Sequence, residues 1–99
     1  METIRIERDD RGVAHLWLAR ADKHNALSAR MIRELAQAAR QLADDSAIRV
    51  VVLAAEGRSF CAGGDLGWMQ DQMRADRQTR RAGARELAQM LNLLNLLPK

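Results

Sequence analysis

A run of four apolar residues, Val50, Val51, Val52 and Leu53, constrains the fold more than any other feature of this sequence. Three of the four are β-branched, and such a run is typical of a strand that is covered on both faces. A helical pattern precedes it and another extended segment precedes the helix. Strand, helix and buried strand make a βαβ unit, for which a right-handed crossover is expected. The sequence therefore predicts an α/β fold.

The first 45 residues supply the rest of this unit. Residues 3–8 alternate apolar and polar side chains, a turn signal follows at 9–12, and residues 13–18 predict a second strand, so that a hairpin is expected. His15 in this second strand is expected to point away from the core. Ser28 is a suitable N-cap for a helix that ends near residues 44–46. The apolar stripe of this helix comprises Met31, Ile32, Leu35, Ala38, Ala39 and Leu42.

Two helices are expected after residue 65. Residues 70–85 are polar and charged, which is typical of a solvated helical face. Residues 86–97 carry an apolar stripe again, and Pro98 stops the helix. One helix covers only one face of the strand at 48–55, and no further strand follows in the sequence to flank it. We therefore expect residues 1–99 to form the incomplete N-terminal part of a larger domain.

The composition argues against several classes of protein. Sixteen Lys and Arg against thirteen Asp and Glu give a net charge of +3, spread along the chain with only 3% aromatic residues, which does not suit nucleic-acid binding. No apolar run approaches the roughly 18–20 residues of a membrane span, and no secretory signal is visible. The single cysteine, Cys61, suits a reducing compartment and hence the cytoplasm. His15, His24 and Cys61 lack metal-ligand spacing, so no metal site is expected.

The loop at residues 60–65, Phe-Cys-Ala-Gly-Gly-Asp, is the sharpest candidate for a site. It lies between the apolar strand and the start of a helix, where open α/β folds bind ligands. Gly63 and Gly64 let the backbone approach a ligand, and backbone N–H groups there can stabilise an oxygen that gains negative charge. An ordinary left-handed turn before a helix, capped by Asp65, is the alternative. Neither a dinucleotide fingerprint nor a P-loop matches these residues.

In combination, several motifs resemble those of the enoyl-CoA hydratase/isomerase, or crotonase, superfamily. They are the hairpin strand at 13–18, Lys-His-Asn-Ala-Leu at 23–27, the apolar strand at 50–53, and Arg-Ser-Phe-Cys-Ala-Gly-Gly-Asp-Leu at 58–66. The resemblance spans the chain and implies the N-terminal part of a crotonase-like ββα fold. It also implies an acyl-CoA thioester substrate, with no cofactor apart from the CoA of the substrate, and a homo-oligomer, a trimer or a dimer of trimers.

The resemblance assigns roles to particular residues. Gly64 matches the catalytic position whose N–H binds the thioester oxygen. Lys23, His24 and Ala26 match a segment that lines the CoA, and Ala62 matches a position whose backbone meets the adenine. Asp65 and Leu66 complete the expected substrate-binding set. Arg58 matches a basic position near the CoA phosphates.

The chain also departs from the family pattern. The family's second oxyanion donor and its catalytic glutamates lie downstream of Lys99, and Glu34, Glu56 and Glu86 do not fit their positions. The isolated chain is therefore expected not to catalyse hydration. One alternative is a non-catalytic CoA-binding module. Another is an assembly fragment whose apolar face at residues 91–97 binds partner proteins.

The segment at residues 65–70 resembles the methylglutaconyl-CoA hydratase branch of leucine breakdown. Acyl specificity in such enzymes depends on the residues that line the acyl pocket. Trp68 and Met69 are candidates for that pocket. Packing of the following helix against the core is the alternative role for both.

Overall fold

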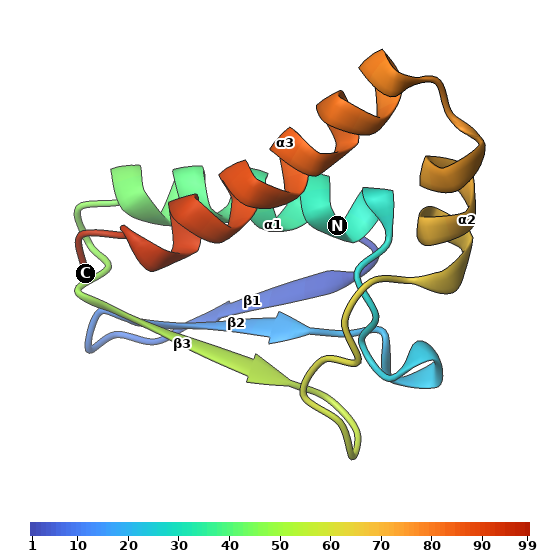
Figure 1. Cartoon of the computed structure of the whole chain (residues 1–99). Coiled ribbons are helices and arrows are strands. Elements are labelled where there is room, and N and C mark those ends of the chain that lie inside the picture. Colours follow the sequence, from blue (N-terminus) through green and yellow to red (C-terminus); the bar gives the residue numbers. More distant parts are fainter.

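A three-stranded sheet forms one layer of the protein, and helices cover one of its faces (Figure 1). The computed structural model describes all 99 residues. The strands are β1 (Ile4–Arg8), β2 (Val13–Leu18) and β3 (Val50–Ala55). The helices are α1 (Ala29–Asp44), α2 (Leu66–Arg74) and α3 (Arg77–Asn95), and a short 3-10 turn at Ala21–Lys23 follows β2. This arrangement confirms the predicted α/β fold.

The sheet has the order β1-β2-β3. β1 pairs antiparallel with β2, with Ile6 opposite Leu16, which confirms the predicted hairpin. β3 pairs parallel with β2 and places Leu53 opposite Leu16. The β2-α1-β3 segment is thus the predicted βαβ unit. Its geometry brings the carboxyl ends of β2 and β3 to the same edge of the sheet, where the two loops that follow them meet.

The core lies between the sheet and α1. Ser28 caps α1 as predicted, because its hydroxyl accepts a hydrogen bond from the Met31 N–H at 3.2 Å. Alternate residues of β2, namely Ala14, Leu16 and Leu18, point into the core, while His15 lies on the opposite face beside Trp17. All six residues of the predicted apolar stripe of α1 are buried: Met31, Ile32, Leu35, Ala38, Ala39 and Leu42.

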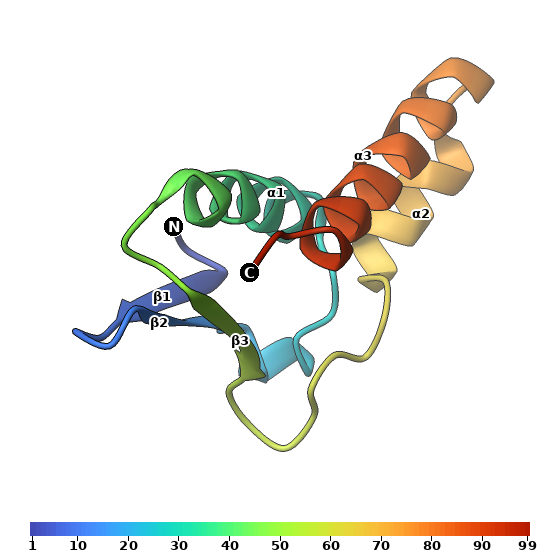
Figure 2. The ribbon, with the colours of Figure 1, turned by 90° about the vertical axis from the view of Figure 1, so that its left-hand side faces the viewer.

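The prediction that both faces of β3 are covered is wrong for this chain. Val50, Val52 and Leu53 are 49%, 38% and 41% exposed. β3 is an edge strand, and the helices lie on one side of the sheet only (Figure 2). The apolar run therefore reflects the β propensity of these residues. No group within residues 1–99 covers the second face of β3.

Two helices follow residue 65 as expected, but the break between them falls inside the charged segment at residues 70–85, which was predicted as one helical face. α2 ends before Ala75, and α3 begins with Asp76 as its N-cap. The Asp76 carboxylate accepts a hydrogen bond from the Thr79 N–H at 2.8 Å, and this bond lowers the pKa of Asp76. The N-terminal half of α3 is exposed, which agrees with the predicted solvated face. Met90 of the C-terminal half is buried in the core.

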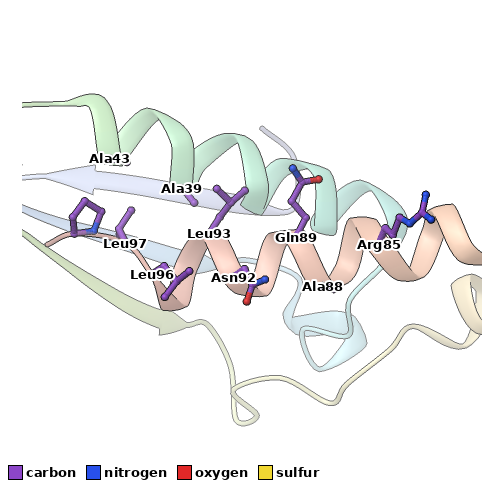
Figure 3. Close-up of a pocket in the computed structure, with 10 residues that line it drawn as sticks. Ala39, Ala43, Arg85, Ala88, Gln89, Asn92, Leu93, Leu96 and Leu97 are labelled. Carbon is purple, nitrogen blue, oxygen red and sulfur yellow. The ribbon is translucent and has the colours of Figure 1, made fainter.

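A groove of about 540 Å³ lies along the junction of α1 with the C-terminal half of α3 (Figure 3). Its wall is largely apolar, and Arg85 is its only charged residue. The groove contains none of the predicted site residues. It is lined by Ala39, Ala43, Arg85, Ala88, Gln89, Asn92, Leu93, Leu96, Leu97 and Pro98.

Candidate functional site

A cavity of about 600 Å³ lies where the loops after β2 and β3 meet the start of α2. It brings together all seven residues that the sequence singled out as substrate-binding, whereas Arg58 is not among its lining residues. Arg20, Asp22 and Gly67 also line it, and sequence reasoning assigned them no role there. Met69, a candidate for the acyl pocket, lines it as well, whereas Trp68 does not. The complete lining is Arg20, Asp22, Lys23, His24, Ala26, Ala62, Gly64, Asp65, Leu66, Gly67 and Met69.

Asn25 links the loop that follows β2 to the loop that follows β3. Its side chain is fully buried, and its Nδ2 donates to the carbonyl oxygens of Glu56 at 2.8 Å and Ser59 at 2.9 Å. Its Oδ1 accepts from the Arg20 N–H at 2.8 Å. The backbone at His24 and Asn25 has positive φ, 53° and 56°, which asparagine tolerates better than most residues. Sequence reasoning missed this role, although an asparagine inside a short polar turn was the available signal.

A short backbone ladder then positions Gly64. The Leu27 N–H donates to the Gly63 oxygen at 2.7 Å, and the Asp65 N–H donates to the Leu27 oxygen at 2.9 Å. These bonds make a parallel bridge between Leu27 and Gly64. Because successive N–H groups of an extended segment point to opposite sides, the Gly64 N–H points away from Leu27. It donates to no acceptor in the protein.

The two glycines of this loop differ in conformation, and the left-handed turn that the sequence offered as an alternative lies at Gly63. Gly63 has φ of 93°, so it is the left-handed residue of the turn and a side chain there would be strained. Gly64 has the unused amide and lines the cavity. The turn at Gly63 thus sets the direction in which the Gly64 segment leaves the loop.

Arg20 and Asp65 form a largely buried ion pair behind this segment. The Arg20 guanidinium is 2.7 Å from Oδ2 of Asp65 and also donates to the Ala26 oxygen at 2.7 Å. Oδ1 of Asp65 accepts from the Trp68 N–H at 2.9 Å, so Asp65 caps α2 as predicted. The Trp68 N–H and then the Arg20 guanidinium lower the pKa of Asp65 below its usual value. The pair therefore fixes the start of α2 against the loop that contains Ala26.

Replacing Asp65 by asparagine is expected to cost about 1 kcal/mol of unfolding free energy at neutral pH. Asparagine caps a helix as well as aspartate does, so the cost isolates the ion pair with Arg20. The folded pKa is lowered, so the pair stabilises the fold above the unfolded value of 3.8 and loses this effect as the pH falls through the folded pKa. Urea unfolding of wild type and Asp65→Asn at neutral and strongly acidic pH measures the difference.

The exposed Asp71 of α2 has no ion pair and supplies a matched control. Asp71→Asn is expected to leave the stability nearly unchanged at both pH values. A cost of Asp65→Asn that persists at strongly acidic pH would show that the ion pair is not its cause.

The glutamates of the chain lie outside this cavity. Glu34 accepts hydrogen bonds from the N–H and the hydroxyl of Thr3 at 2.8 and 2.6 Å. Burial raises the pKa of Glu34, but the bonds from Thr3 and Glu2 outweigh it and the net shift is downward. Glu56 pairs with Arg5 at 2.8 Å, and Glu86 is exposed on α3. Asp22 and Asp65 are the acidic residues that line the cavity.

Two further properties of the whole chain bear on its class. No group of three or more His, Cys, Asp or Glu residues lies together so as to hold a metal ion. None of the helices combines the length and the apolar content that crossing a bilayer requires.

A glycine loop that follows a parallel strand, and that presents an unused amide beside a helix start, is typical of α/β proteins that bind ligands beyond the carboxyl ends of their strands. The profile of the enoyl-CoA hydratase/isomerase family matches residues 8–97. The chain therefore belongs to the enoyl-CoA hydratase/isomerase family. This confirms the family predicted from the motifs.

Similar proteins agree with this assignment. The protein of Mycobacterium tuberculosis named "Probable enoyl-CoA hydratase echA8" is 37% identical over 75 residues, which are 76% of this chain and 29% of the relative. The 4-chlorobenzoyl coenzyme A dehalogenase-2 of Arthrobacter sp is 41% identical over 63 residues, or 64% of this chain and 22% of the relative. The crystal structure of an enoyl-CoA hydratase from Shewanella pealeana superposes with a TM-score of 0.94 at 35% identity, covering 99% of this chain and 37% of that one. The chain thus spans 22% to 37% of the length of these three proteins, and its fold is that of the crotonase-type enoyl-CoA hydratases.

Proposed function

We propose that this chain binds an acyl-CoA thioester in the cavity at Gly64, and that the Gly64 N–H donates a hydrogen bond to the thioester oxygen. The observation that carries this proposal is the unused amide of Gly64 on the wall of a cavity of about 600 Å³. Lys23, His24, Ala26 and Ala62 line the same cavity, which gives the CoA moiety a surface to occupy. The family membership of the chain supports the class of ligand.

The chemistry that such a donor assists follows from the thioester. Addition of water to, or removal of a proton from, an unsaturated acyl-CoA makes the carbonyl enolate-like, and negative charge gathers on its oxygen. A fixed N–H aimed at this oxygen stabilises the transition state more than the ground state. The amide precedes α2, whose N-terminal dipole adds to the effect. We infer an enoyl-CoA hydratase or isomerase role in which Gly64 supplies half of an oxyanion hole.

Finer parts of the proposal rest on the motifs. The residues at 65–70 favour the methylglutaconyl-CoA hydratase branch. The family pattern favours a homo-oligomer, a trimer or a dimer of trimers. The half-buried free thiol of Cys61 suits a reducing compartment, and we propose the cytoplasm. No metal or separate cofactor is required for this chemistry.

The purified 99-residue chain is expected to bind crotonyl-CoA and not to hydrate it. Of the two acidic residues in the cavity, Asp65 is committed to Arg20 and the Trp68 N–H, and no glutamate lines it. Isothermal titration measures binding, and loss of the absorbance of the conjugated thioester measures hydration. Absence of binding at millimolar ligand would contradict the proposed site. Detectable turnover would contradict the expectation that the catalytic acid/base residues lie outside residues 1–99.

The second candidate is a non-catalytic CoA-binding or assembly module, which the lack of a glutamate in the cavity favours. Titration with free CoA separates the two readings. A module that recognises only the CoA moiety binds free CoA as tightly as crotonyl-CoA. A site that uses the Gly64 amide binds crotonyl-CoA more tightly, because the carbonyl adds a hydrogen bond.

A further inference from the structure

The Gly64 N–H and the Gly63 carbonyl belong to the same peptide group. A peptide group is planar and trans, so its N–H and its C=O point in opposite directions. The Leu27 N–H donates to the Gly63 oxygen at 2.7 Å and thereby sets the direction of the Gly64 N–H. Two adjacent glycines would otherwise let this peptide rotate, since nothing lies within 4 Å of a Cβ atom placed on Gly63.

The same relation holds one peptide group further back. The Leu27 N–H shares its peptide group with the Ala26 carbonyl, and the Ala26 oxygen accepts a hydrogen bond from Nη1 of Arg20 at 2.7 Å. A continuous series of hydrogen bonds thus runs from the Arg20 guanidinium, through two peptide groups, to the unused N–H of Gly64.

Arg20 is held at both ends. Its backbone N–H donates to Oδ1 of the buried Asn25 at 2.8 Å, and its Nη2 is 2.7 Å from Oδ2 of Asp65. The side chains of Arg20 and Asp65 are only 20% and 17% exposed, so water screens this pair weakly. The guanidinium is thus committed to two acceptors of the protein, the Asp65 carboxylate and the Ala26 oxygen.

We propose that Arg20 is a positioning residue for the Gly64 amide, and that its guanidinium orients and polarises the two peptide groups that end at this amide. The inference rests on the proposed function and names the residue that prepares its hydrogen-bond donor. A charged donor makes a stronger hydrogen bond than a neutral one, and successive bonds in a series strengthen one another by roughly 10–30% each. The charge of Arg20 thereby favours negative charge on the thioester oxygen without touching the ligand.

The first test needs no ligand. Arg20→Met keeps an unbranched apolar side chain and removes every side-chain donor. Hydrogen exchange of the Leu27 amide, measured by NMR, is expected to become about fivefold faster relative to the Ala38 amide at the centre of α1, which corresponds to the loss of about one net hydrogen bond. A general loss of stability would instead accelerate both amides by the same factor.

The second test uses the proposed ligand. The hydrogen bond from Gly64 is expected to give wild type a preference of about three- to tenfold for crotonyl-CoA over free CoA. Arg20→Met is expected to lose most of this preference. It is also expected to shift the infrared band of a carbon-13-labelled thioester carbonyl less than wild type does. A direct contact between Arg20 and the CoA moiety would instead weaken the binding of both ligands equally and would overturn the inference.

Arg30→Met is the matched control. Arg30 pairs with Glu2 and Glu34, away from both loops of the site, so its loss removes a comparable ion pair elsewhere. This variant is expected to leave the relative exchange of Leu27 and the preference for crotonyl-CoA unchanged.

A second variant covers the case in which Arg20→Met does not fold because the Asp65 carboxylate has lost its partner. Arg20→Met/Asp65→Asn leaves no unpaired carboxylate, and asparagine keeps the cap of α2. It is expected to show the same gain in Leu27 exchange and the same loss of preference as Arg20→Met.

The remaining outcomes separate the inference from the proposed function. Unchanged relative exchange of Leu27 in the folded variants at residue 20 overturns the inference and leaves the proposed function standing. An undiminished preference in these variants, or an equal loss in Arg30→Met, overturns the inference in the same way. Failure of wild type to bind any thioester overturns the proposed function together with the inference.

Discussion

Asn25→Ala is expected to lower the free energy of unfolding by about 3–5 kcal/mol, the largest effect of any single substitution considered. The substitution leaves the Arg20 N–H and the carbonyl oxygens of Glu56 and Ser59 without their present partner, and because these bonds are part-buried each loss costs about 1 kcal/mol. Alanine must also adopt the positive φ of 56°, which adds about 1 kcal/mol. Such a loss is a large fraction of the stability of a small domain. Urea unfolding followed by circular dichroism measures it.

Asn25→Gly separates the two contributions. Glycine takes the left-handed backbone without strain and loses the same side-chain bonds, so it is expected to be about 1 kcal/mol more stable than Asn25→Ala. Asn92→Ala on α3 removes an asparagine that makes no side-chain hydrogen bond to the protein and serves as the control. If Asn25→Ala unfolds no more readily than Asn92→Ala, the side chain of Asn25 does not hold the loops together.

The elements of this fold follow from short-range patterns in the sequence. The period-two alternation of β1, the N-cap at Ser28 and the apolar stripe of α1 depend on neighbouring residues only, and the structure agrees with all of them. The environment of β3 could not be obtained in this way. A run of β-branched residues predicts a strand, but whether a second layer covers its outer face depends on groups far away or absent, and in this chain Val50, Val52 and Leu53 stay exposed.

The candidate site likewise has some features that the sequence motifs predict and others that depend on residues far apart in the chain. The motifs at residues 23–27 and 58–66 placed the cavity residues, because the resemblance treats both segments as one site. The role of Arg20 was not visible, since its partners Asp65 and Ala26 are 45 and 6 residues away and no local pattern joins them. The cavity between α2 and the N-terminal half of α3 was not visible either, because the sequence predicted residues 70–85 only as a solvated helical face. The packing of α3 against α2 brings arginines of α3 and methionines of α2 to the same cavity, and the charge pattern of the sequence does not show this.

Gly64→Pro is expected to abolish the hydrogen bond to the thioester oxygen, because proline has no N–H. Loss of one net hydrogen bond weakens the binding of crotonyl-CoA by about three- to tenfold, equivalent to about 0.5–1.5 kcal/mol. Infrared spectra with a carbon-13 label at the thioester carbonyl give a direct readout. Wild type is expected to shift the carbonyl band to lower frequency on binding, and Gly64→Pro is expected to leave it where it lies in water-free solvent. In a full-length enzyme that carries this loop, kcat is expected to fall roughly 10²–10³-fold, as for removal of one oxyanion donor.

Gly64→Ala is the matched control for this experiment. Alanine keeps the N–H and adds a Cβ at the same place, 3.3 Å from Cγ of Met69, where a flexible side chain can yield. The alanine variant is therefore expected to retain the infrared shift and most of the affinity, since the amide rather than the space beside it binds the oxygen. A proline variant that is folded and still shifts the carbonyl band would assign the oxyanion contact to another group. An alanine variant as impaired as the proline variant would show that the close approach of Met69 to Gly64, and not the hydrogen bond, limits the site.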